Sequence, residues 1–349
     1  MASVTLVDQS STALVRTEMA PAPANNLKSP PVLTRAGNRI LQWAFDRGIA
    51  RNVHLVAEGG ESLRRAVDRL RQAYLRYDRP VGLLARVEAQ AWSGPLTPPS
   101  PAPTPATWFR PERGDSRGFV FYVHGGSFVC EKSPRVTRMI AKLAAAAGAR
   151  VFSPDYRLAP EHPCPAAIED VIAAWRWLAA TYPDEPLIAA AESSGAAILM
   201  AALCEVRDQG GRLPDAVLLF SPWVDLSLQS WSVTAASMTA STPYSMASLA
   251  VMSRLYLQGR PATDPLASPI FGDLSGLPPM LIHASQSDIV FDDARRLAQA
   301  VEAAGGELTL RVWRGQTHVW ERTESAEARH SLDLAAAFIE AHATAAAAP

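Results

Sequence analysis

The sequence predicts an α/β protein in which a mostly parallel central sheet is flanked by helices on both faces. From residue 118 onward, short apolar runs alternate with longer segments whose apolar residues recur at helical spacing, a pattern typical of βαβ units. The apolar runs are continuous, as expected for strands buried on both faces. Of the 349 residues, 48% are hydrophobic and 19% charged, which is ordinary globular composition and argues against wholesale disorder.

Each strand and helix of this pattern can be given a range. Two strands, 85–92 and 106–110, precede the alternation and flank a proline-rich segment at 94–107. Proline cannot join a central strand or helix, so this segment is interpreted as an extended loop, with a ligand for another protein module as the alternative. Further strands are expected at 118–123, 150–154, 187–191, 216–220, 280–283 and 308–313. Helices are expected at 134–147, 166–182, 196–208, 292–304 and 326–341.

Three parts of the chain fall outside this alternation. Residues 1–32 are rich in Ala, Ser, Thr and Pro without a sustained period, and are predicted to be a disordered leader. Residues 33–80 contain two predicted helices, at 40–49 and 63–75. Residues 226–263 are rich in Ser, Thr, Met and aromatics, and indicate an insertion at the C-terminal rim of the sheet, where α/β proteins place their sites. The predicted core is the remainder, 81–225 and 264–349.

Charge and cysteine content exclude several classes of function. Lys and Arg total 33 against 34 Asp and Glu, a formal net charge of −1 with no dense basic stripe, so nucleic acid is not an expected partner. The longest apolar runs fall far short of the roughly 20 residues that span a bilayer, and we see no signal peptide. Three widely spaced cysteines and seven histidines without ligand spacing indicate neither a disulfide framework nor a metal site. A cytoplasmic location is expected.

The segment Ala191-Glu192-Ser193-Ser194-Gly195 lies between an apolar strand and an Ala-rich helix. A nucleophilic serine on a tight strand-to-helix turn requires small residues two positions before and after it, and this condition is met around Ser193. With Ser194 as the nucleophile, Glu192 would occupy a position that demands a small side chain, so Ser193 is preferred. An ordinary helix-capping serine is the alternative.

A second motif, His124-Gly125-Gly126-Ser127-Phe128, directly follows the strand expected at 118–123. Successive glycines allow backbone N–H groups to point outward, as acyl transfer requires where a carbonyl oxygen becomes an oxyanion. A phosphate-binding loop would need a longer Gly-rich turn and a lysine, which are absent here. A simple tight turn is the other alternative.

The second motif resembles the His-Gly-Gly-Gly loop of the hormone-sensitive-lipase-like family of α/β-hydrolases, which includes many bacterial carboxylesterases. Further stretches match the family in order, and the resemblance covers about 87–341. They are Asp155–Ala167 (DYRLAPEHPCPAA), Ser221–Asp225 (SPWVD), Asp264-Pro265 and Gly315–His318 (GQTH). The resemblance implies the α/β-hydrolase fold, with a helical cap built from the N-terminal helices and the insertion. It also implies no cofactor, a small-molecule ester as substrate and, since family members often dimerise, a homodimer.

Two features depart from the usual family pattern. The family's elbow is Gly-Asp-Ser-Ala-Gly-Gly, whereas residues 191–196 read Ala-Glu-Ser-Ser-Gly-Ala. Ser127 replaces the third loop glycine, as in the plant gibberellin receptors, a branch that binds a ligand and has lost the catalytic histidine. A non-catalytic binding protein is therefore one alternative function, although His318 argues against it.

The order of the hydrolase triad is serine, acid, histidine, and Ser193, Asp288 and His318 obey it. Asp288 lies in a segment similar to the family's acid-bearing loop, and Asp225, which also ends a strand, is the second candidate. In this interpretation Ser193 attacks, His318 acts as general base and then acid, and Asp288 orients it. The N–H groups of Gly125, Gly126 and Ser194 hold the oxyanion.

The function expected from these residues is hydrolysis of short- to medium-chain acyl esters through an acyl-enzyme. An acyltransferase or lyase-type relative using the same triad is the first alternative. The predicted substrate pocket takes residues from the loop and from the insertion: Ser127, Phe128, Trp231, Tyr244 and Met246.

Overall fold

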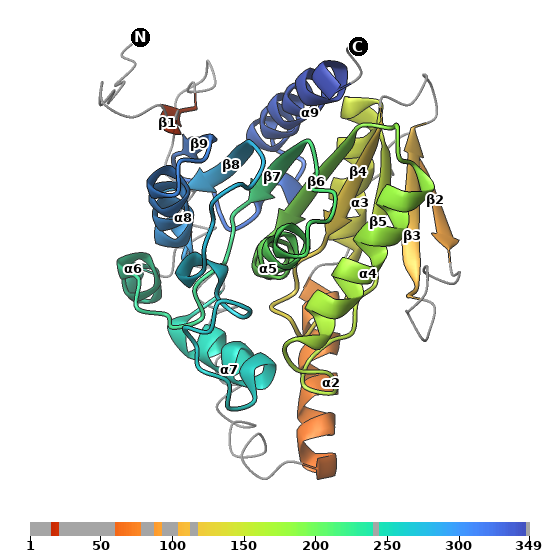
Figure 1. Ribbon diagram of the computed structural model, residues 1–349. Helices are drawn as coiled ribbons and strands as arrows, with labels where there is room; N and C mark the ends of the chain where they lie inside the picture. The colour runs from red at the N-terminus through yellow and green to blue at the C-terminus, as the bar shows by residue number, and fades with distance from the viewer. Residues whose placement is uncertain are drawn as a thin grey trace.

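The computed structural model describes residues 15–20, 60–77, 87–92, 104–111, 118–239 and 244–346. Within these ranges a nine-stranded sheet has the order β1-β9-β8-β7-β6-β4-β5-β3-β2 (Figure 1). All neighbouring strands are parallel except the pairs β2–β3 and β3–β5. The strands are β1 (Val15–Met19), β2 (Val87–Trp92), β3 (Ala106–Pro111), β4 (Phe119–Val123), β5 (Arg150–Pro154), β6 (Leu187–Glu192), β7 (Ala216–Phe220), β8 (Met280–Ser285) and β9 (Leu308–Trp313).

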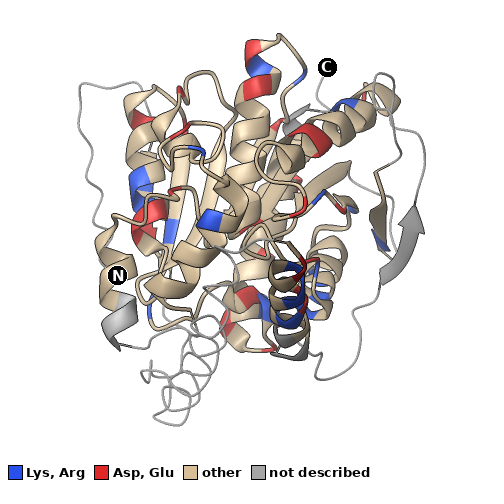
Figure 2. Ribbon diagram, turned by 90° about the horizontal axis from the view of Figure 1, so that it is seen from below, with Lys and Arg blue, Asp and Glu red and all other residues tan. Residues whose placement is uncertain are grey.

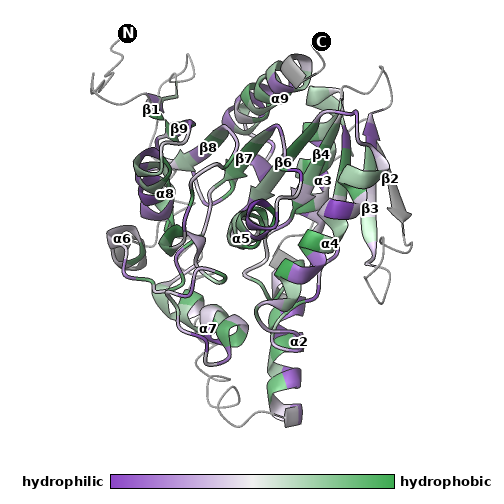
Figure 3. Ribbon diagram, in the orientation of Figure 1, coloured by the Kyte–Doolittle hydropathy of each residue, from purple (hydrophilic) through white to green (hydrophobic). Residues whose placement is uncertain are grey.

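Helices cover both faces of the sheet. They are α2 (Gly60–Tyr77), α3 (Pro134–Ala147), α4 (Ala166–Thr181), α5 (Ser194–Asp208), α6 (Trp231–Thr239), α7 (Met246–Leu257), α8 (Phe291–Ala303) and α9 (Ala326–Ala346). Helices α3 and α9 pack in one apolar cluster with one face of the sheet, whereas α4, α5 and α8 share a second cluster with the other face. The central strands β4, β6 and β7 are accordingly apolar, apart from Glu192 at the end of β6 (Figure 3). The predicted fold class is confirmed.

Local chemistry explains why the predicted boundaries lie close to the observed ones. Helix α3 begins after Ser133, whose side chain accepts a hydrogen bond from the Val136 N–H, and Pro134 occupies the first helical turn. It ends at Gly148, whose φ of 58° is the left-handed conformation that glycine adopts without strain. Ranges 134–147, 150–154, 216–220 and 308–313 are observed as predicted.

The N-terminal strand β1 corrects the prediction of a wholly disordered leader. Val15–Met19 pairs in parallel with β9 and covers what would be an open sheet edge. Glu18 forms an ion pair with Arg311 across that edge, at 3.1 Å. Apart from Ala20, the rest of 1–32 lies outside the described residues, as does the helix predicted at 40–49.

Helices α2 and α7 lie beyond one end of the sheet, and α6 lies next to α7 and α8 (Figure 1). We call α2, α6 and α7 the cap helices. Arg71 of α2 anchors this group to the core, because its guanidinium donates to the carbonyl oxygens of Val129 (2.8 Å) and Ala159 (3.0 Å) and pairs with Glu161. From α7, the carbonyl of Tyr256 accepts a hydrogen bond from the Cys164 N–H. The assignment of residues 33–80 and 226–263 to a cap stays a proposal.

Basic and acidic residues are interspersed along the described helices and loops (Figure 2). None of the described helices combines the length and hydropathy needed to cross a membrane.

Candidate active site

The turn between β6 and α5 carries Ser193 in a strained conformation. Its φ and ψ are 50° and −128°, a combination that costs a non-glycine residue about 1–3 kcal/mol and persists only where the surrounding structure enforces it. The Ser193 N–H donates to Phe220 of β7 (3.0 Å), and its carbonyl accepts from Trp223 (3.1 Å). A Cβ atom on Gly195 would lie only 2.4 Å from the Val123 carbonyl oxygen, so the turn requires glycine there. The sheet therefore holds the serine in this conformation.

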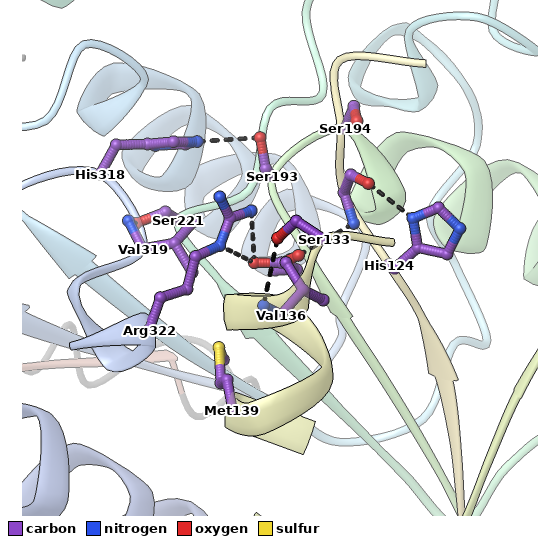
Figure 4. Close-up of polar contacts among 12 residues, drawn as sticks. His124, Ser133, Val136, Met139, Ser193, Ser194, Ser221, His318, Val319 and Arg322 are labelled. Carbon is purple, nitrogen blue, oxygen red and sulfur yellow. Dashed lines mark hydrogen bonds and ion pairs between the residues drawn. The ribbon is translucent and has the colours of Figure 1, made fainter. Parts of the chain in front are cut away.

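Ser193, His318 and Asp288 form one continuous chain of hydrogen bonds. The Oγ of Ser193 is 2.8 Å from Nε2 of His318, whose Nδ1 lies 2.9 Å from both carboxylate oxygens of Asp288. Figure 4 shows the His318 ring directed at Ser193. Because a carboxylate can only accept, the ring proton is assigned to Nδ1, and Nε2 is left to accept the Ser193 proton.

The loops that carry the acid and the histidine are held by the end of β8. The Ser285 hydroxyl donates to the Gln316 carbonyl (2.9 Å) and accepts from the Gln316 N–H (3.1 Å), while the Ser285 carbonyl accepts from the Asp288 N–H (3.0 Å). On the other side of His318, the N–H of Val319 donates to the Ser221 hydroxyl (3.2 Å). Side chains separated by 30 and 125 positions are thus brought into one line.

Asp225, the second candidate acid, has other partners. Its carboxylate pairs with Arg296 and accepts the Ser227 N–H (2.8 Å). The neighbouring Asp293 accepts the N–H groups of Val224 and Asp225, both at 2.9 Å, and burial raises its pKa to about 8. These carboxylates join the start of the insertion to α8, and among the described contacts neither reaches His318.

The loop 124–128, which we call the oxyanion loop, has a positive φ at three consecutive residues, and two of them, Ser127 and Phe128, are strained because they are not glycine. The φ angles are 128° at Gly126, 54° at Ser127 and 65° at Phe128. A side chain at position 126 would meet the Cys130 carbonyl oxygen at 2.3 Å. Of the three predicted oxyanion donors, Gly125 already donates its N–H to the Glu192 carboxylate at 3.1 Å. The N–H groups of Gly126 and Ser194 make no hydrogen bond among the described residues.

His124, at the start of this loop, is a structural residue. Burial lowers the pKa of its imidazole to about 3, so the ring is neutral. Its Nδ1 lies 2.6 Å from the Gly125 carbonyl, its ring stacks on Tyr156 at 4.4 Å, and the Tyr156 hydroxyl donates to its carbonyl at 2.6 Å. The Glu192 carboxylate, fully buried, pairs with Arg322 at 2.7 Å. Nothing in the sequence had indicated Arg322, whereas Tyr156 lies within the stretch 155–167.

The predicted pocket residues divide into two groups. Phe128 is buried and stacks on Tyr256 with ring centres 4.1 Å apart, and the Tyr244 ring meets His318 edge-on at 5.5 Å. Ser127 is partly buried in the loop. Trp231 and Met246 are instead exposed, at 72% and 43%. The inward side of α6 is formed by Ser232 and its neighbour Val233, so Trp231 faces solvent.

A cavity of about 700 Å³ lies between α2 and α7, and none of the triad or predicted pocket residues lines it. Its walls are formed by Leu63, Pro160, Leu226, Leu228, Ala250, Ser253, Arg254, Leu255, Leu257, Gln258, Gly259 and Arg260. Within the described part of the chain, no three His, Cys, Asp or Glu side chains come together as metal ligands.

Known proteins are similar to this chain in both sequence and fold. Residues 120–322 match a family model described as alpha/beta hydrolase fold. An acetyl-hydrolase of Streptomyces hygroscopicus is 39% identical over 237 residues, covering 67% of this chain and 79% of the relative. An esterase of Acinetobacter venetianus is 30% identical over 199 residues, covering 56% and 65%.

Solved structures give the same result. A crystal structure of EstE5 soaked with p-nitrophenyl butyrate superposes with a TM-score of 0.71, at 29% identity over 80% of this chain and 92% of that one. An esterase from the bacterial hormone-sensitive lipase family superposes with a TM-score of 0.73, at 30% identity over 86% and 98%. The predicted resemblance is confirmed. The chain belongs to the α/β-hydrolase fold family, among the hormone-sensitive-lipase-like carboxylesterases of the serine hydrolase type.

Proposed function

We propose that this esterase hydrolyses esters of short- to medium-chain acyl groups through an acyl-enzyme on Ser193. The observation that supports this most is the unbroken line from Ser193 through His318 to Asp288, at 2.8 and 2.9 Å. A neutral imidazole in that position is a general base for the hydroxyl.

The reaction follows from this geometry in two halves. Ser193 Oγ attacks the ester carbonyl carbon as Nε2 of His318 removes its proton, and Asp288 stabilises the imidazolium that results. The N–H groups of Gly126 and Ser194 are the proposed donors to the oxyanion. The tetrahedral intermediate collapses, His318 returns the proton to the departing alcohol, and the acyl group remains on Ser193. A water molecule, deprotonated by His318, then repeats these steps and releases the acid.

The acyl size is supported by what the relatives act on or were exposed to. One relative is named an acetyl-hydrolase, and the EstE5 crystals were soaked with a butyrate ester, which correspond to two and four acyl carbons. Phe128, stacked on Tyr256 and packed against Trp223, forms a rigid aromatic wall next to the oxyanion loop. We propose that this wall limits the length of the acyl chain.

The test is hydrolysis of p-nitrophenyl esters of graded chain length by the wild type and by Ser193→Ala. We expect kcat/KM to be highest for acyl chains of two to eight carbons and the variant to be inactive. A fluorophosphonate probe should label the wild type and leave Ser193→Ala unlabelled. Adding an alcohol as acceptor separates hydrolysis from acyl transfer, because a transferase would form more of the new ester of that alcohol than of the free acid. Labelling of Ser193→Ala at the wild-type rate, or no turnover of any ester, would refute the proposal.

A further inference from the structure

The backbone conformation of the oxyanion loop is energetically unfavourable by itself. Ser127 and Phe128 both lie in the left-handed region, directly after a glycine with a φ of 128°. Such a run persists only where contacts from outside the loop over-determine it. The side chains of Glu192 and Ser194 make such contacts, one at each end of the loop.

At the first end of the loop, the contact comes from Glu192. One carboxylate oxygen accepts the Gly125 N–H at 3.1 Å, and the other lies 2.7 and 2.9 Å from the Arg322 guanidinium. The Glu192 side chain is fully buried and that of Arg322 is 10% exposed, so both depend on the pair for compensation. Figure 4 shows the Arg322 guanidinium below Ser193, between His318 and His124. Arg322 also lies 3.4 Å from the hydroxyl of Tyr74, on cap helix α2.

At the other end of the loop, the contact comes from Ser194. Its hydroxyl accepts a hydrogen bond from the Phe128 N–H at 3.2 Å, and Ser194 is fully buried. Alanine, the family's usual residue at this position, could not accept that bond. Glutamate at 192, where the family usually has aspartate, is one methylene longer and spans the distance between Gly125 and Arg322.

We propose that Glu192 and Ser194 are positioning residues that hold the oxyanion loop from its two ends. Glu192 acts through the Gly125 N–H and is itself held by Arg322, and Ser194 acts through the Phe128 N–H. Two of the four departures of the elbow from the usual family pattern, at positions 192 and 194, thereby fix the backbone that presents the Gly126 N–H. This inference rests on the proposed esterase mechanism.

The variants that test it are Glu192→Asp, Glu192→Gln and Ser194→Ala. Aspartate is too short to reach both partners, and glutamine removes the carboxylate charge that pairs with Arg322. A displacement of the loop by a fraction of an ångström weakens the hydrogen bonds to the oxyanion. We therefore expect kcat for p-nitrophenyl butyrate to fall about 10- to 100-fold in the Glu192 variants and about 3- to 10-fold in Ser194→Ala. KM should change less than about threefold, because the ground-state ester does not depend on that contact.

A tetrahedral probe separates positioning from general destabilisation. Phenylboronic acid adds to a serine hydroxyl and places a boron-bound oxygen where the oxyanion would lie. Its inhibition constant should weaken in step with the loss of kcat/KM across the series. The matched control is Glu321→Gln, an equally buried carboxyl beside Arg322 that has no hydrogen bond to the loop among the described residues. We expect its kcat and inhibition constant to stay within about twofold of the wild type.

The inference is overturned if folded Glu192→Asp and Ser194→Ala both retain wild-type kcat. It is also overturned if kcat falls while the inhibition constant is unchanged. If the Glu192 variants fail to fold, kcat and the phenylboronic acid inhibition constant of Ser194→Ala test the inference by themselves. Failure of the esterase mechanism itself would appear differently, as a wild type without turnover or an active Ser193→Ala.

Discussion

Replacing Gly195 with alanine adds one methyl group at the tightest point of the nucleophile turn. The backbone torsions at this position suit any residue, so the change tests space alone. The added Cβ would lie 2.4 Å from the Val123 carbonyl oxygen and 2.5 Å from that of His124. Both are backbone atoms that join β4 to the oxyanion loop, and neither can rotate away.

The size of the effect follows from these distances. An ordinary contact begins near 3.4 Å, so the backbone at 123–124 must retreat by about 1 Å. Overpacking of this kind costs about 1–3 kcal/mol, which lowers Tm by about 1–4 °C in a chain of this length. The same movement shifts the oxyanion donors relative to Ser193, and a misplacement of about 1 Å can reduce kcat by about 10²-fold.

The assay is steady-state hydrolysis of p-nitrophenyl butyrate together with a thermal melt. The matched control is Gly272→Ala, distant in sequence, where the added Cβ would approach Pro265 Cβ at 3.2 Å and φ is −92°. We expect the control to keep kcat within about twofold. A Gly195→Ala enzyme with wild-type kcat and Tm would show that the turn has more room than the distances indicate.

Three further outcomes are expected. Asp288→Asn should lower kcat by about 10²-fold or more, because His318 loses its orienting carboxylate. Asp225 is equally buried, but Asp225→Asn should lower Tm and keep most of kcat. The reverse result would identify Asp225 as the acid of the triad. Ala191→Gly should keep activity within a few-fold and destabilise the strand by about 0.5–1 kcal/mol, measured by urea unfolding; a loss above 10-fold would contradict the small-residue rule for this turn. Burial raises the pKa of Glu321 from 4.5 to about 8, so between these pH values the folded state binds one more proton than the unfolded state and loses stability as pH rises. Glu321→Gln should therefore flatten the decline of Tm between pH 5 and 8. Identical slopes in the wild type and the variant would show that another group causes the decline.

The sequence by itself determined the elements and the candidate chemistry. Continuous apolar runs and helical spacing are local properties, so strands such as 216–220 and 308–313 could be predicted to the residue. The small residues around Ser193 and the glycines after His124 indicated a turn and a donor loop for equally local reasons, and the family order pointed to Asp288 and His318. The structure brings these three side chains together, while their catalytic roles remain a proposal.

Tertiary structure decided which polar groups are already occupied. No local signal could show that Glu192 accepts the Gly125 N–H, 67 positions away, or pairs with Arg322, 130 positions away. Likewise, only packing shows that Trp231 faces solvent and that Val15–Met19 pairs with β9. These contacts join segments that are far apart in the sequence, so no single stretch of the chain can indicate them. They depend on the order of the strands in the sheet and on which charged side chains the assembled sheet buries together.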